Sequence, residues 1–160
     1  MQWIRCVLLL MFAQTASAAN APGGTEAPRC VIRDYGIIQT SSEYMRRMEP
    51  ATTSGGVRSY FEIRIVRTTN EVPAERGVQF GIAHEFLNIP ALDKVEMVVT
   101  HPAMTKPNGT TSTGFRLSWP SSQTFTTYGL DNDYEVVRGD WKFQYYFKGM
   151  LLCEQAFRTL

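Results

Sequence analysis

The stretch WKFQYYFKGMLLCEQAF, residues 141–157, decides the fold of this chain. Aromatic residues occupy every second position of its first half: Trp141, Phe143, Tyr145 and Phe147. This period of two predicts a β-strand with one apolar face. Residues 148–150 then form a turn into a second strand, residues 151–157, so the stretch predicts a β-hairpin. A second layer of structure must cover the apolar face of this hairpin.

The length of the turn decides which residues of the hairpin face each other. A three-residue loop over residues 148–150 sets Phe147 against Leu151, Tyr145 against Cys153 and Trp141 against Phe157. A two-residue loop would instead place the charged Glu154 opposite Phe143. Because a one-residue slip changes the face of every side chain, burial favours the three-residue loop, with Gly149 at positive φ.

The same alternation recurs upstream. Two segments place every second residue on one face: Val78, Phe80, Ile82, His84 and Phe86, and then Val95, Met97, Val99 and His101. Further strands are predicted over residues 31–40, 59–68, 115–119, 124–128 and 134–137. Residues 43–48 are compatible with one helical turn. About eight strands with no helical period predict an all-β fold, an immunoglobulin-like antiparallel β-sandwich of about seven to nine strands, with a small β-barrel as the alternative.

The N-terminus is typical of a secretory signal peptide. Residues 1–19 combine Arg5, a short apolar run over residues 7–13 and the small-residue pattern of residues 16–18. We expect cleavage there, a flexible Gly/Pro-rich leader over residues 20–29 and a single domain over residues 30–160. The mature chain has no apolar run long enough to cross a membrane. The expected location is therefore periplasmic or secreted.

The charge balance argues against a nucleic-acid partner. The chain has 16 Lys and Arg against 15 Asp and Glu, and loss of Arg5 with the signal peptide leaves the two signs equal. Nucleic-acid binding depends on clustered basic side chains, and none occurs here. No motif for a cofactor is present either.

Two cysteines, Cys30 and Cys153, remain in the mature chain. In an oxidising compartment such a pair is a candidate disulfide. The first and last strands of an immunoglobulin-like sandwich often lie near each other, which would bring the two together. The alternative is two separate buried thiols.

No arrangement for catalysis is recognisable, so we assign no catalytic and no metal-binding residues. His84 and His101 would lie on apolar faces, where histidines usually bond to backbone or carboxylate groups, and Glu85 points to the wrong face to join them at a metal. The acidic residues of the segment LDNDYE (Asp131, Asp133 and Glu135) allow a calcium site or a solvated turn.

Residues 101–114, HPAMTKPNGTTSTG, are the best candidate for a recognition surface. We expect a long loop here, and loops on a rigid sandwich commonly carry recognition. Its candidate contact residues are His101, Met104, Lys106 and Asn108.

Several short motifs occur in a characteristic order: Asp34-Tyr35-Gly36, Val72-Pro73-Ala74 leading to Gly77, Phe80 and Gly81, His101-Pro102 with Met104, Trp119-Pro120, and Gly139-x-Trp141-x-Phe143 ending in Phe157. With these motifs the chain resembles, over residues 31–158, a bacterial family of secreted domains known only as a domain of unknown function. It departs from the pattern at Arg138, where the family leads us to expect proline. The resemblance implies a β-sandwich outside the cytoplasm, and it implies no activity.

Together these features predict a binding or protein-interaction module without catalytic activity, whose partner is an envelope or extracellular protein or a glycan. An exposed sheet edge, where a partner strand can add, is a second candidate contact surface. One alternative is a hydrolase of an envelope polymer, with a histidine and a carboxylate in a deep pocket. The other is a structural envelope protein held rigid by a Cys30–Cys153 disulfide.

Overall fold

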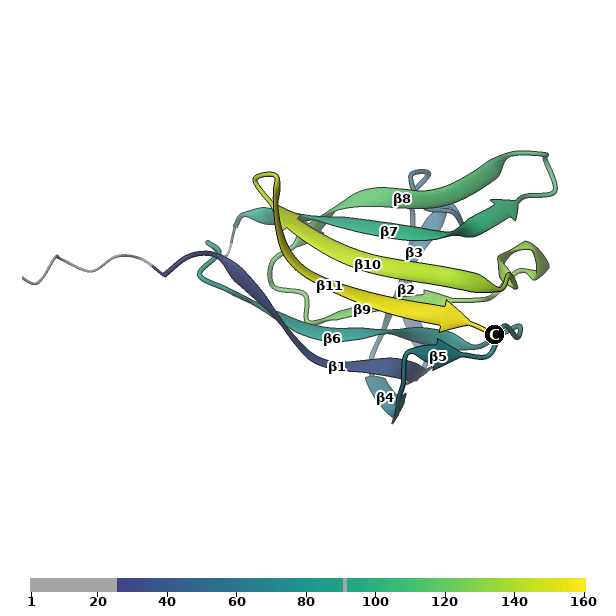
Figure 1. Ribbon diagram of the computed structural model, residues 1–160, viewed down its shortest axis with the longest axis horizontal. Helices are drawn as coiled ribbons and strands as arrows, with labels where there is room; N and C mark the ends of the chain where they lie inside the picture. The colour runs from purple at the N-terminus through teal and green to yellow at the C-terminus, as the bar shows by residue number, and fades with distance from the viewer. Residues whose placement is uncertain (1–25, 91) are drawn as a thin grey trace, which may run out of the picture.

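The computed structural model describes residues 26–90 and 92–160 of the chain (Figure 1). The predicted signal peptide, residues 1–19, and the leader up to residue 25 lie outside these residues. The described part contains eleven strands: β1 (Arg29–Thr40), β2 (Glu43–Met48), β3 (Gly56–Tyr60), β4 (Ile63–Thr68), β5 (Glu71–Val72), β6 (Gln79–Leu87), β7 (Lys94–Thr105), β8 (Thr111–Pro120), β9 (Phe125–Gly129), β10 (Gly139–Phe147) and β11 (Met150–Thr159).

The strands form two facing sheets and a separate hairpin. One sheet has the order β4-β1-β6-β9, the other has the order β5-β11-β10-β7-β8, and β2 pairs with β3 alone. Neither large sheet closes on itself, so the fold is the predicted β-sandwich and not a barrel. None of the helical structure in the described residues is long and apolar enough to cross a membrane.

In the β10–β11 hairpin the apolar residues of β10 lie on one face, as predicted. The turn, however, is shorter than predicted, and a bulge compensates for the difference in register. Lys148 and Gly149 both have positive φ, 49° and 81°, and form a two-residue turn. Phe147 therefore faces Met150, and the predicted pairing of Phe147 with Leu151 is wrong. A bulge on β11 then shifts the register by one residue. Beyond it, Tyr145 pairs with Cys153 and Trp141 with Phe157, as predicted.

The core lies between the two large sheets. The alternating residues of β10 (Trp141, Phe143, Tyr145 and Phe147) are all buried, and so are those predicted on β7 (Val95, Met97, Val99 and His101). From the facing sheet, β6 contributes Phe80 and Ile82, each fully buried. The Phe80 ring meets the ring of Trp141 edge to face at a centroid distance of 5.1 Å. The period-two pattern thus identified the inner faces correctly.

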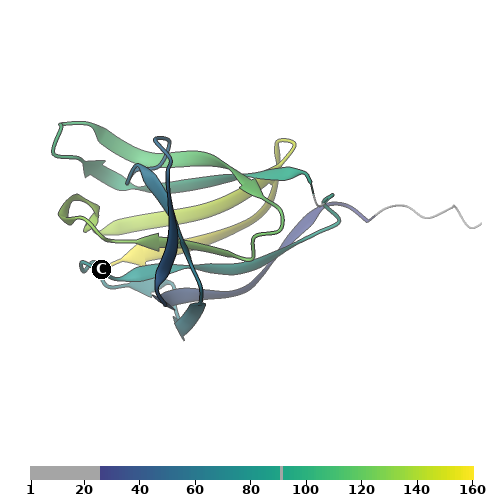
Figure 2. The same cartoon turned by 180° about the vertical axis from the view of Figure 1, so that it is seen from behind.

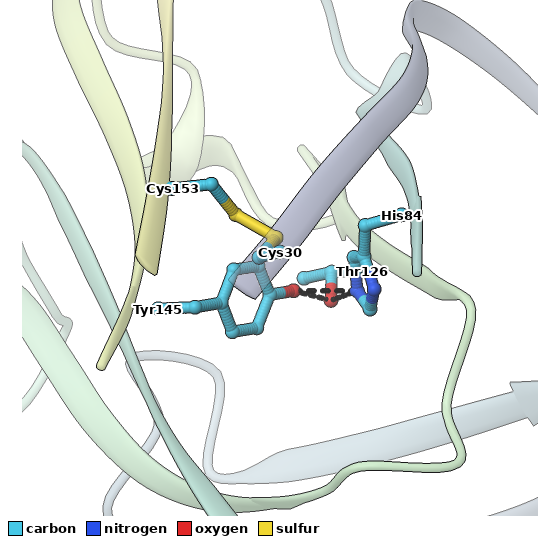
Figure 3. Close-up of a disulfide and its surroundings, with 5 residues drawn as sticks. All are labelled: Cys30, His84, Thr126, Tyr145 and Cys153. Atoms are coloured by element: carbon cyan, nitrogen blue, oxygen red, sulfur yellow. Dashed lines mark hydrogen bonds between the residues drawn. A yellow bond between two sulfur atoms is a disulfide. The ribbon is translucent and has the colours of Figure 1, made fainter. Parts of the chain in front are cut away.

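A disulfide between Cys30 and Cys153 joins the two sheets at one side of the sandwich, with the Cα atoms 5.5 Å apart (Figure 3). Cys30 lies on β1 and Cys153 on β11, so the first and last strands meet, as expected, but they belong to different sheets. Further along the same two strands, the centroids of the Tyr35 and Phe157 rings are 6.2 Å apart.

The β2–β3 hairpin continues the β1–β4 ladder beyond a bend. The Ser41 amide donates to the Glu62 carbonyl at 3.1 Å, and the Glu62 amide donates to Ser41 Oγ at 2.8 Å. From this bend the hairpin crosses the opposite side of the sandwich, between β8 and β9 (Figure 2). Two expectations fail here. Residues 43–48 are a strand, and residues 59–68 break at Phe61, whose side chain is 73% exposed.

Two further expectations about local structure are wrong. Residues 101–114 are mostly strand, because β7 and β8 continue until only a short turn over residues 106–110 separates them. Residues 134–137 do not form a strand: a short 3-10 helix, η1 (Asp133–Glu135), takes their place because the Glu135 carboxylate bonds back to the chain before it.

Candidate functional site

A cavity of about 330 Å³ lies at the side of the sandwich opposite the disulfide. Its walls come from β8 and β9, the edge strands of the two sheets, and its roof is the β2–β3 hairpin (Figure 2). Its volume lies at the lower end of the range of small-molecule sites. The disulfide thus joins the two sheets at one side of the sandwich, and the cavity lies between them at the other side.

The cavity has a lining that is both polar and apolar, and its hydroxyl and amide side chains are Thr52, Ser54, Ser59, Ser118, Gln123, Thr126 and Thr127. It reaches core side chains of both β7 and β8 and the centre of β10: Met97, Val99, Leu117 and Phe143. Aromatic rings line the rest of the walls: Tyr44, Tyr60, Phe115, Trp119, Phe125 and Tyr128. A ligand entering this space would bury apolar surface against rigid sheet residues.

Charged side chains line the outer part. Three are cations, Arg47, Arg58 and Lys94, and one is an anion, Asp131, so the lining carries a net formal charge of +2. Two of the cations have ion-pair partners: Arg58 lies 2.9 Å from Asp131, and Arg47 lies 3.6 Å from Glu49. Lys94 is exposed and has no ion-pair partner among the described residues.

Trp119 pairs with Val95, which is buried, so its ring lies on the inner face of the sheet, whereas Lys94, the residue before Val95, lies on the other face. The indole Nε1 of Trp119 is buried and has no hydrogen-bond partner in the described part of the chain. A buried donor without an acceptor is unfavourable. Because Nε1 is buried, it does not face the space of the cavity.

The hairpin roof is fastened to the sandwich at two points. One is the Arg58–Asp131 ion pair. The other is at its tip, where buried Thr53 Oγ1 lies 2.7 Å from His101 Nε2 and 3.2 Å from Ser112 Oγ. The Nδ1 atom of His101 bonds to the Pro102 carbonyl at 2.7 Å, which fixes the ring. Burial lowers the pKa of His101.

His84 takes part in a different buried cluster, which shares Thr126 with the lining of the cavity. Its Nε2 bonds to the Tyr145 hydroxyl at 2.8 Å and to Thr126 Oγ1 at 3.2 Å, and the latter two also bond to each other (Figure 3). Burial lowers the pKa of His84 to about 4 and raises that of Tyr145. The cluster is therefore neutral over the physiological pH range.

The two histidines thus lie on facing sheets, β6 and β7, each with its own partners. Neither side chain lines the cavity, and neither bonds to a carboxylate. The described residues contain no group of three or more His, Cys, Asp or Glu that would hold a metal ion.

The three acidic residues around η1 each have different partners. Asp131 pairs with Arg58, and Asp133 pairs with Arg76 at 3.3 Å. Glu135 is fully buried, and its carboxylate accepts hydrogen bonds from the Tyr128 hydroxyl, the amides of Asp131 and Asn132 and the Asn132 side chain, at 2.9–3.1 Å. These contacts order the turn and occupy the oxygens that a cation would need.

The four residues predicted for recognition fall into two pairs. His101 and Met104 are buried, with exposures of 5% and 0%, because they lie on the inner face of β7. Lys106 and Asn108 lie at the solvent-facing turn between β7 and β8. Only the second pair is available to a partner.

The cavity residues were not identified from the sequence. Residues 41–56 are mostly polar and show neither the period of a strand nor that of a helix. The other lining residues come from strands that are far apart in the chain. One signal was present: Tyr44, Met45 and Met48 are large apolar side chains in a segment with no matching core face, and all three are exposed. Clustered exposed apolar residues often mark a contact surface.

Fold and cavity together define an immunoglobulin-like β-sandwich domain with a small lateral cavity. The chain belongs to the family described as a domain of unknown function, DUF3859, which matches residues 27–159. A solved structure of an immunoglobulin-like protein from Pseudomonas aeruginosa is similar, with a TM-score of 0.62 and 19% identity over 86% of this chain and 100% of that one. No curated protein matches the chain.

Proposed function

We propose that this domain is a binding module without catalytic activity that works in the periplasm or after secretion. It would recognise its ligand through the cavity between β8 and β9 and the exposed outer face of the β2–β3 hairpin. The cavity is the observation that carries the proposal: it opens into the core and is bordered by side chains that the fold leaves exposed.

Exposed apolar side chains of the hairpin support the same surface. Tyr44, Met45 and Met48 are 55%, 51% and 78% exposed. Phe61, at the base of the hairpin, stacks with Tyr44 at a centroid distance of 4.8 Å although both rings face solvent. Apolar groups held together in this way lose little entropy when a partner covers them.

The proposed location rests on the signal-peptide pattern of residues 1–19 and on the disulfide, which persists in oxidising compartments. The hydrolase alternative required a histidine and a carboxylate in a deep pocket, and the cavity has no histidine in its lining. The turn with Lys106 and Asn108 remains a second candidate contact surface.

Retention of envelope components on the immobilised domain tests this proposal. Three proteins are compared: the wild type, a double variant Met45→Ser with Met48→Ser on the hairpin, and Leu92→Ser, which removes an even more exposed apolar residue outside the hairpin and cavity. Bound proteins and bound small molecules are both identified by mass spectrometry. We expect a component that wild type and Leu92→Ser retain and the hairpin variant loses. If retention is the same for all three proteins, the hairpin is not the recognition surface.

A further inference from the structure

The polar side chains that line the cavity are mostly uncharged, and the charged ones are compensated or lie elsewhere. Arg58 lies 2.9 Å from Asp131, and Arg47 lies 3.6 Å from Glu49. Lys94 lies on the other face of its sheet from the inner residues of β8. Burying a charge without a counter-charge is unfavourable, so this lining favours a neutral ligand.

The uncharged polar groups of the lining indicate that the ligand also has hydroxyl or amide groups. Ser59 pairs with Met45 across the hairpin and lies on the same face of β3 as Val57, which packs against the core. The Ser59 side chain therefore points toward the sandwich. Gln123 contributes an exposed amide from the β8–β9 connection. A purely aliphatic ligand would take water from these groups and offer no hydrogen bond in return.

A second, more open hollow adjoins the cavity at the base of the hairpin. Residues 60–64 and 123–125 line this hollow, which we call the side groove. Phe61 lines the side groove, and its ring stacks with that of Tyr44, a cavity residue, at a centroid distance of 4.8 Å. Four residues line both hollows: Tyr60, Ile63, Gln123 and Phe125. A ligand longer than one ring can therefore extend from the cavity into the side groove.

From these observations we propose that the cavity and the side groove together bind a neutral oligosaccharide. A sugar ring has apolar C–H faces and a rim of hydroxyl groups, which matches a lining of aromatic rings interspersed with hydroxyl and amide side chains. One sugar ring lies in the cavity, and the next lies against the Tyr44–Phe61 pair. At the border, Arg58 donates and Asp131 accepts hydrogen bonds, so the two can bind neighbouring hydroxyl groups. This deepens the proposed function and rests on it.

NMR titration of the ¹⁵N-labelled mature domain tests the proposal with defined probes. The neutral probes are cellotetraose, maltotetraose, chitotetraose and their monosaccharides. Tetragalacturonate is the acidic probe, and a capped tetra-alanine peptide is the probe without sugar. We expect at least one neutral tetrasaccharide to bind and to shift amide signals in residues 43–64 and 123–128. Its monosaccharide, which fills the cavity alone, and the acidic probe should each bind at least about tenfold more weakly.

Two variants locate the site. Phe61→Ala removes half of the exposed aromatic pair and should weaken the tetrasaccharide roughly fivefold without changing the affinity for the monosaccharide. Gln123→Ala removes the amide where the two hollows adjoin and should also weaken the tetrasaccharide roughly fivefold. The matched controls Leu92→Ala and Asn70→Ala change residues outside both hollows and should bind as wild type. All four side chains are exposed, so each variant should fold, as judged by circular dichroism.

Failure of the oligosaccharide proposal is distinguishable from failure of the binding module. If no neutral tetrasaccharide binds, or if the acidic probe or the peptide binds as tightly, the oligosaccharide assignment is wrong. Unchanged affinity in either Phe61→Ala or Gln123→Ala would place the site elsewhere and also overturn it. In each of these cases, retention of an envelope component that depends on the hairpin would still support a binding module with another ligand.

Discussion

His84 lies in an environment very different from that of a free side chain in water. It is 2% exposed, and this burial lowers its pKa to about 4. Its Nε2 bonds to the hydroxyl groups of Tyr145 and Thr126. In the unfolded chain the imidazole titrates near 6.5. Between these two values the unfolded state binds more protons, so stability must decrease as the pH falls from 6.5 to 4.

We therefore predict that the free energy of unfolding drops by up to about 3 kcal/mol over this pH window. Urea unfolding at pH 7, 6, 5 and 4 measures the decrease, and the NMR titration of the two imidazoles measures the cause. His101→Gln serves to assign the signals. A His84 titration near pH 6.5 would show that the ring is accessible to water and would contradict this interpretation.

Glu135 differs from His84 because it is a buried carboxylate whose two oxygens both accept hydrogen bonds. Its carboxylate accepts four hydrogen bonds, three of them from the turn before η1 and one from Tyr128. We predict that Glu135→Ala lowers the free energy of unfolding by about 3 kcal/mol, because several buried donors lose their acceptor. Asp133→Ala, at the exposed neighbouring carboxylate, should cost less than about 0.5 kcal/mol. Equal losses in thermal or urea unfolding would mean that the bonds of Glu135 contribute nothing specific.

The β2–β3 hairpin is the element on which the proposed function depends. Its tip is held by Thr53, whose hydroxyl bonds to His101 and Ser112 in the interior. Thr53→Val keeps the shape and removes these bonds. We predict faster amide hydrogen exchange in residues 43–60, by roughly tenfold, with unchanged exchange in β10. Thr105→Val, which removes an exposed hydroxyl pair with Thr111, is the control. Exchange that rises equally in all strands would indicate global destabilisation and not release of the hairpin.

Elements with one buried face were predictable from the sequence, and elements without one were not. The strands β6, β7 and β10 have side chains that alternate between core and surface, and period two found them. Strand β2 has all six residues exposed, so its sequence carries no such signal and was compatible with a helical turn. The β7–β8 connection was misjudged because Pro and Gly residues suggested a loop where paired strands continue.

The turn of the β10–β11 hairpin shows why register resists prediction. Burial logic correctly required Trp141 opposite Phe157. Burial alone favours a three-residue loop, but a bulge on β11 gives the same alignment with a two-residue turn. The cavity could not be predicted from the sequence either, because strands far apart in the chain form its lining.

At the scale of the whole molecule, the two sides of the sandwich differ. At one side the Cys30–Cys153 bridge closes a loop with a sequence separation of 123 residues. In the chain-entropy account, this constraint on the unfolded chain stabilises the fold by about 5 kcal/mol. We predict a loss of 2–5 kcal/mol for the double variant Cys30→Ala with Cys153→Ala, measured by urea unfolding in parallel with the reduced wild type. An unchanged midpoint in both proteins would contradict a stabilising role of the bridge.

At the other side, the cavity under the hairpin is the proposed recognition site, and the methionines report on it directly. Met45 and Met97 line the cavity, Met104 is buried elsewhere in the core, and Met150 lies at the distant β10–β11 turn. We would label the methionine methyl groups with ¹³C and record their NMR spectrum while adding envelope extract. The account predicts shifts at Met45 and Met97 with Met104 and Met150 unchanged; shifts confined to Met150, or none at all, would contradict it.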